Sequence, residues 1–178
     1  MKVIKLYEYG YEPAALGFSL SYNSSIERAK ELLPKYAIGK DPGENKFLRV
    51  MQVWLDVDMP RLMWQEADQY KIATTTLSES TMHTLSKRLL IQEDFAINIS
   101  DELLTVINNK IFQYQNKQIS ILELKSCLPE GFLQRRIWNL NYATIQNIIL
   151  QREYHKLNLW KIFIDDLVNQ LDYPEFVR

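Results

Sequence analysis

The segment from Lys71 to His83 gathers side chains that could bind an anion. It starts with one cation, Lys71, and places six hydroxyl groups around a single carboxylate, Glu79. The hydroxyl residues are Thr74, Thr75, Thr76, Ser78, Ser80 and Thr81. A helix beginning near Ser80 would add its positive N-terminal end, which attracts phosphate. Ser and Thr are also common in solvated loops that cap a following helix, so the segment is either an anion-binding edge or a capping loop.

A second candidate is the stretch from Trp138 to Arg152, for which the spacing of apolar residues predicts a helix. One stripe of this helix consists of Asn141, Ile145, Ile148 and Arg152. A guanidinium on a buried stripe needs a partner, because an unpaired buried charge is strongly unfavourable. The partner of Arg152 is either a carboxylate of the protein, such as Asp68 or Glu79, or a ligand phosphate bound in a fork geometry.

The elements that position these residues can be outlined from hydrophobic periodicity. Alternation predicts strands over Met1–Tyr9 and Phe47–Asp58. Gly10–Ser25 is expected to be a loop because it contains both Pro and Gly, and Gly39–Gly43 is expected to be a turn. Helical spacing predicts helices from Ser25 to Pro34, from Pro60 to Lys71, from Ser100 to Tyr114 and from Ile119 to Cys127.

The composition fits one ordered domain covering residues 1–178, with 47% hydrophobic residues. A net charge of −1 gives no overall field that favours nucleic acid or an acidic membrane surface. The single cysteine, Cys127, excludes an internal disulfide framework and favours a reducing compartment, the cytoplasm. Two His and one Cys are too few for the usual four-ligand zinc site, so no metal is expected. We expect neither a signal peptide nor a membrane span, since no apolar run approaches about 18 residues.

The first candidate segment resembles the signature of flavin-dependent thymidylate synthases (ThyX), in a divergent form found in phage genomes. In that family a helix ends in an Arg-His-Arg run, which is followed by an Asn-Glu pair, a Ser and an Arg. Lys71 stands at the first Arg, and Ser78 and Glu79 stand at the Asn-Glu pair. Thr81 stands at the Ser and His83 at the last Arg.

The second candidate stretch carries another match to the same family. Its members have a late helix that begins with Asn near the flavin and ends with an Arg that binds the nucleotide. Asn141 and Arg152 have the spacing of this pair. Leu128-Pro129 resembles the Leu-Pro before that helix, and a helix over Leu157–Leu171 resembles the closing segment of the family.

The resemblance implies an α+β fold of the thymidylate-synthase-complementing type, with a small antiparallel or mixed sheet packed with several helices. It implies that FAD contacts Lys71 and Asn141. It implies that a pyrimidine nucleotide, uridylate, contacts Glu79, Thr81, His83 and Arg152. In the family the site lies between subunits of a homotetramer, so a homo-oligomer is expected. The family's reaction uses no enzymic cysteine nucleophile, so Cys127 is not expected to act.

Several positions depart from the family pattern and remove charge. Ile72 and Ala73 replace the His and the second Arg of the signature, and Ala143 replaces a further Arg. Because family members hold phosphates with these side chains, the losses weaken the expected catalytic site. Cations that could compensate are Arg49, Arg61, Arg135 and Arg136, although such residues are more often surface charges.

Three hypotheses about function follow. The first is a ThyX-like phage accessory protein with a degenerate catalytic site that still binds uridylate or flavin. The second is an active, divergent flavin-dependent thymidylate synthase that methylates dUMP. The third is a non-enzymatic protein-binding module, such as an inhibitor of a host or defence protein, on the same scaffold.

Overall fold

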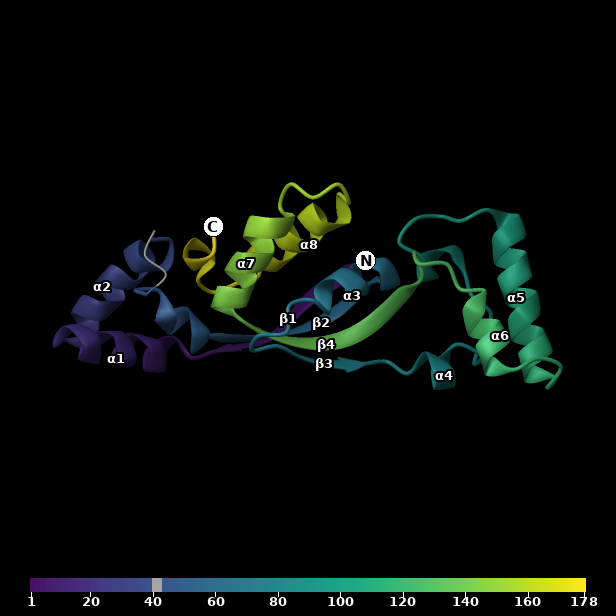
Figure 1. Ribbon diagram of the computed structural model, residues 1–178, viewed down its shortest axis with the longest axis horizontal. Helices are drawn as coiled ribbons and strands as arrows, with labels where there is room; N and C mark the ends of the chain where they lie inside the picture. Colours follow the sequence, from purple (N-terminus) through teal and green to yellow (C-terminus); the bar gives the residue numbers. More distant parts are fainter. Residues whose placement is uncertain (40–42) are drawn as a thin grey trace. The chain divides into compact units, whose positions relative to one another are not determined.

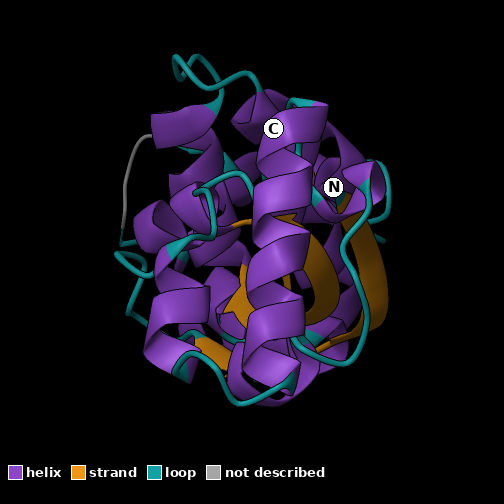
Figure 2. Cartoon of the chain, turned by 90° about the vertical axis from the view of Figure 1, so that its right-hand side faces the viewer, coloured by secondary structure: helices purple, strands orange, loops and turns teal. Residues whose placement is uncertain are grey.

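The computed structural model describes residues 1–39 and 43–178. Most of the turn predicted at Gly39–Gly43 therefore lies outside the described residues. The described chain combines helices with one sheet, which confirms the predicted α+β class (Figure 2). No helix in this part of the chain is long and apolar enough to cross a membrane.

The sheet has four strands in the order β1-β2-β4-β3 (Figure 1). The strands are β1 (Lys2–Tyr9), β2 (Gln52–Pro60), β3 (Thr75–Ser78) and β4 (Leu133–Asn141). In β2 the side chains of Val53, Leu55 and Val57 are fully buried, as their alternation predicted. The predicted strand start at Phe47 is wrong, because Lys46–Arg49 forms a 3₁₀ helix whose Phe47 and Leu48 side chains are buried.

The helices account for most of the remaining chain. They are α1 (Tyr11–Tyr22), α2 (Ile26–Ala37), α3 (Arg61–Ala67), α4 (Thr81–Thr84), α5 (Asp101–Gln115), α6 (Ile121–Ser126), α7 (Tyr142–Arg152) and α8 (Leu159–Val168). The start predicted for α5 is confirmed, and the Ser100 hydroxyl caps this helix by accepting from the Leu103 N–H. The start near Ser80 is also confirmed, although α4 is only one turn long.

The loop predicted over Gly10–Ser25 is wrong, because α1 occupies most of it. Gly10 adopts φ 105°, which turns the chain out of β1, and its carbonyl accepts from the Ala14 N–H. Pro13 lies in the first turn, where a missing N–H breaks no helical hydrogen bond. Pro therefore did not mark a loop here.

Two further predicted helices differ from the structure in their boundaries. The helix predicted to end at Pro34 continues to Ala37, because Ala29, Leu33 and Ala37 form a buried i, i+4, i+8 stripe. The helix predicted from Pro60 to Lys71 is confined to α3.

The helix predicted from Trp138 is wrong in its first part, because the chain remains in β4 up to Asn141. Trp138 and Leu140 are buried in this strand at alternating positions. Inside the expected hydroxyl loop, Thr75–Ser78 forms β3, in keeping with the β propensity of Thr.

The contacts within the chain define two compact units. Unit 1 contains Met1, Asp58–Gln69 and Leu77–Arg136, and α6 contacts α5 in it (Figure 1). Its apolar core consists of Leu85, Leu90, Phe95, Ile107, Ile111, Leu124, Leu128 and Phe132. Burial of this core fixes α4, α6 and the start of β4, which carry the candidate site.

Unit 2 contains Lys2–Val57, Tyr70–Thr76 and Ile137–Arg178. Here α1 contacts α2, α8 contacts β1, and α7 contacts α8. The Phe163 ring lies 5.9 Å from the Trp138 ring and 5.7 Å from the Trp160 ring, measured between centroids. These aromatic contacts join α8 to the second half of β4.

Candidate anion-binding site

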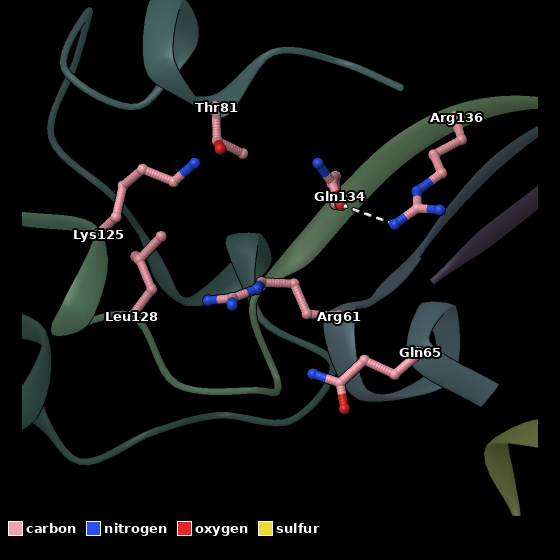
Figure 3. Close-up of a pocket in the computed structure, with 7 residues that line it drawn as sticks. All are labelled: Arg61, Gln65, Thr81, Lys125, Leu128, Gln134 and Arg136. Atoms are coloured by element: carbon pink, nitrogen blue, oxygen red, sulfur yellow. Dashed lines mark hydrogen bonds between the residues drawn. The ribbon is translucent and has the colours of Figure 1, made fainter. Parts of the chain in front are cut away.

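Thr81, one of the predicted substrate-binding residues, lies in a pocket of unit 1 with a volume of about 280 Å³. The pocket is lined by Arg61, Gln65, Thr81, Lys125, Leu128, Gln134 and Arg136. Figure 3 shows Lys125 and Thr81 on one side, Arg136 on the opposite side, and Gln134 between them. Of the described residues that line this pocket, three carry a positive charge and none carries a carboxylate.

Secondary structure explains why these side chains meet. Arg61 and Gln65 are separated by four residues on α3 and therefore share one helix face. Gln134 and Arg136 are separated by two residues on β4 and therefore point to the same face of the sheet. Thr81 is the first residue of α4. The pocket thus joins one face of α3 to one face of β4.

Nearby carboxylates neutralise the three cations of the pocket to different degrees. Arg136 forms an ion pair with Asp68, with 2.8 Å between Nη1 and Oδ1. The nearest carboxylate oxygen of Glu130 lies 3.9 Å from Arg61 Nη2, which is a long ion pair. Among the described residues, the Lys125 ammonium has no carboxylate within ion-pair distance. Lys125 is therefore the cation most open to an added anion.

Arg136 is held tightly on the wall of the pocket. Its guanidinium lies 4.3 Å from the centre of the Trp64 ring, and Nη2 donates to Gln134 Oε1 at 3.3 Å. The Nε atom is buried and has no hydrogen-bond partner in the described chain. Trp64 belongs to the core, because only 1% of it is exposed.

Glu79, a second predicted site residue, follows β3 and is bonded to β4 through its backbone. Its N–H donates to the Arg135 carbonyl, and its carbonyl accepts from Gln134 Nε2 at 3.2 Å. Its carboxylate accepts from the Thr84 hydroxyl and lines another pocket of about 240 Å³, together with Arg135. Gln134 and Arg135 therefore face different pockets, as neighbours on a strand must.

Asp94 lines that other pocket and is paired with Arg88. Burial raises the pKa of Asp94, but hydrogen bonds from the Arg88 guanidinium and the Ile91 N–H outweigh it, so the pKa lies below its ordinary value. His83, a third predicted residue of this unit, is exposed on α4, and its backbone N–H donates to the Ser80 carbonyl.

The other three predicted residues, Lys71, Asn141 and Arg152, belong to unit 2. Asn141 is 3% exposed and caps α7, because its Oδ1 accepts from the Thr144 N–H at 2.8 Å. Lys71 is exposed. Asn141 and Arg152 bracket the same helix, whose 11 residues separate them by roughly 16 Å.

Tyr70 and Trp160 hold the Arg152 guanidinium. Arg152 Nε donates to the Tyr70 hydroxyl at 3.0 Å, and the guanidinium lies 5.9 Å and 5.4 Å from the centres of the Tyr70 and Trp160 rings. The Thr144 hydroxyl donates to the Ile72 carbonyl at 3.1 Å. The segment from Tyr70 to Ile72 therefore lies alongside α7.

Sequence reasoning missed Lys125, Gln65 and Gln134 as pocket residues. The sequence does carry a signal for Gln134 and Arg136, because polar residues two apart on a strand share a face. The strand itself was not predicted, so this signal was not used. No sequence signal indicates that Lys125 lines the pocket, since a single Lys on a short helix carries no information about distant contacts.

No protein-family model and no curated protein matches the sequence. Solved structures do match. A crystal structure of flavin-dependent thymidylate synthase ThyX from Helicobacter pylori, complexed with FAD and dUMP, has a TM-score of 0.84 and 15% sequence identity. The match covers 100% of this chain and 98% of that chain. A second ThyX structure from the same organism, with FAD and dUMP, has a TM-score of 0.84 and 16% identity, and covers 100% and 97% of the two chains. The chain therefore has the fold of flavin-dependent thymidylate synthase ThyX, as its sequence motifs predicted.

Proposed function

We propose that this protein binds a pyrimidine nucleotide, dUMP, on a ThyX-like scaffold and acts as a phage accessory protein with a degenerate catalytic site. The observation that carries this proposal is the cationic pocket of unit 1. Thr81, which the motif assigns to the nucleotide, shares that pocket with Arg61, Lys125 and Arg136. The structures that the fold matches are themselves complexes with dUMP.

The charge of the pocket suits a phosphate monoester. A phosphate group carries close to two negative charges and accepts several hydrogen bonds. Lys125 and Arg61 are the cations with the weakest internal neutralisation, and the Thr81 hydroxyl adds a donor. Each hydrogen bond to a charged group contributes about 1.5–3 kcal/mol. Two such contacts would tighten binding by roughly two to four orders of magnitude.

The residues assigned to FAD fit a flavin dinucleotide less well than the pocket of unit 1 fits a phosphate monoester. Its diphosphate needs cations, and of the positions that match family Arg residues, Ala73 and Ala143 supply no charge. Lys71 is exposed, and the Asn141 carbonyl oxygen already caps α7. We therefore assign no reaction step to a flavin, and favour nucleotide binding without thymidylate synthesis over an active enzyme.

The experiment is a calorimetric titration of dUMP into the purified protein, repeated with Lys125→Gln. We expect saturable binding to the natural protein and a loss of about tenfold or more in the variant, because one charge-assisted contact is removed. Lys87→Gln is the matched control, since Lys87 is an exposed Lys of the same unit that does not line the pocket. Equal losses in both variants would show that net charge, not the pocket, binds the nucleotide.

We also propose that the protein is a homo-oligomer. Leu150 and Tyr154, at the end of α7 and just beyond it, are 83% and 93% exposed, and burying their apolar surface against a second copy would favour association. Size-exclusion chromatography with light scattering should give a multiple of 21.1 kDa. A 21.1 kDa particle at micromolar concentration would contradict this proposal.

A further inference from the structure

Strand β1 lies at one end of the sheet that the described residues form, so only one of its two backbone edges faces another strand of that sheet. The peptide groups of the outer edge could bond to an added strand, and such edges are a common route to association between chains. The sequence of β1 favours strand pairing, because half of its residues are β-branched or aromatic. Tyr7 and Tyr9 on this strand are 59% and 63% exposed. An uncovered outer edge of β1 would therefore be a site of self-association.

The side-chain amide of Gln170, two residues beyond the end of α8, bonds to this outer edge. Its Oε1 accepts from the Lys5 N–H at 2.9 Å, and its Nε2 donates to the Val3 carbonyl at 3.0 Å. A residue of a parallel neighbouring strand bonds in the same way, because it donates to one carbonyl and accepts from the N–H two residues further along. The Gln170 side chain thus reproduces the hydrogen bonds of one residue of an added parallel strand.

The Gln170 amide is held in one orientation. Its Nε2 also donates to the Asp166 carbonyl of α8 at 2.8 Å, so both hydrogens of the nitrogen are used. Rotating the amide by 180° would set its oxygen against two carbonyls and its nitrogen against the Lys5 N–H, and three hydrogen bonds would be lost. The backbone of Gln170 is fixed as well, because its N–H donates to the Leu167 carbonyl at 3.0 Å. The amide therefore stays on the edge of β1.

The charge of Lys5 does not protect this edge in place of Gln170. A Lys on an edge strand often prevents pairing, because two like charges repel each other. Here the Lys5 ammonium is paired with Glu8 at 3.0 Å and with Asp172 at 2.5 Å. The Asp172 N–H also donates to Glu8 Oε2 at 2.9 Å. Since two carboxylates neutralise Lys5, the hydrogen bonds of Gln170 are the stronger barrier to an added strand.

We infer that the Gln170 side chain closes the outer edge of β1 and prevents it from pairing with β1 of a second copy of this chain. The inference is independent of nucleotide binding, and it restricts the proposed homo-oligomer to surfaces other than this edge. Without the amide, the Val3 carbonyl and the Lys5 N–H would be open to another strand. Alternate residues of a strand direct their peptide groups to the same edge, so the Tyr7 N–H would extend the pairing.

The first measurement is amide hydrogen exchange. In the natural protein the Lys5 amide should exchange at least about tenfold more slowly than in an unfolded peptide, because it donates to Gln170. Gln170→Met keeps the length of the side chain and removes both hydrogen-bonding groups, so Lys5 exchange should become about tenfold faster.

The second measurement is particle size by light scattering. We expect Gln170→Met to form larger particles than the natural protein at the same concentration. Gln118→Met is the matched control, since it adds the same apolar side chain at an exposed Gln outside β1 and α8, and it should keep the natural size. Adding Tyr7→Pro to Gln170→Met should restore that size, because Pro has no N–H with which an added strand can pair.

Three results would overturn the inference. An unprotected Lys5 amide in the natural protein, which needs no variant, would show that the edge is not covered. Unchanged particle size in Gln170→Met would show that the opened edge does not recruit a second copy. Larger particles that persist with Tyr7→Pro, or that Gln118→Met forms equally, would show that association comes from surface hydrophobicity and not from the strand edge.

Discussion

The substitution Asn141→Ala separates the structural role of this residue from the cofactor-binding role that its motif implies. Asn141 Oδ1 accepts from the Thr144 N–H at the start of α7, and the side chain is buried. Replacing such a cap by Ala costs about 0.5–2 kcal/mol, because the N–H loses its partner. For a chain of this length each kcal/mol shifts the midpoint of thermal unfolding by roughly 2–4 °C.

The assay is thermal and urea unfolding followed by circular dichroism. We expect Asn141→Ala to lower the free energy of unfolding by about 1 kcal/mol and Asn141→Ser to restore most of it, because a Ser hydroxyl also caps well. If Asn141→Ala were as stable as the natural protein, or if Asn141→Ser were no better than Ala, the capping role would be refuted.

Two further predictions concern stability. Leu55→Ala should lower the free energy of unfolding by about 2–5 kcal/mol in a urea titration, because this fully buried β2 side chain would leave a cavity; a loss below about 1 kcal/mol would contradict its place in the core. The lowered pKa of Asp94 predicts pH dependence: its pairing with Arg88 stabilises the fold above the unfolded-state pKa of about 3.9 and is lost as pH falls through the lower folded-state pKa. Asp94→Asn should flatten this acid limb of the stability curve, and an unchanged limb would show that another group causes it.

Helix caps and the periodicity of apolar residues correctly predicted the helices and strands whose positions depend on neighbouring residues in the sequence. The Ser100 cap with the apolar periodicity after it located α5, and the alternation of Val53, Leu55 and Val57 located the centre of β2. The motifs carried by Glu79 and Arg152 led to the correct fold, at only 15% identity to the matching structure.

The errors arose where tertiary contacts override local preference. Pro13 indicated a loop but lies in the one turn of a helix that tolerates it. The helical spacing from Asn141 to Arg152 does not extend back to Trp138, which lies in the buried strand β4. The pocket itself brings together α3, α6 and β4, and such long-range contacts leave no pattern within a single segment.

The most direct measurement is the titration of dUMP into the natural protein at low and moderate salt. We expect saturable binding with a dissociation constant in the micromolar range, and weaker binding at moderate salt because salt screens the attraction between the Lys125 ammonium and the phosphate. Bound dUMP should also raise the midpoint of thermal unfolding. At a hundredfold excess of dUMP over the dissociation constant, the free energy of unfolding should increase by about 2.7 kcal/mol. No heat of binding and no change in the unfolding midpoint at millimolar dUMP would contradict it.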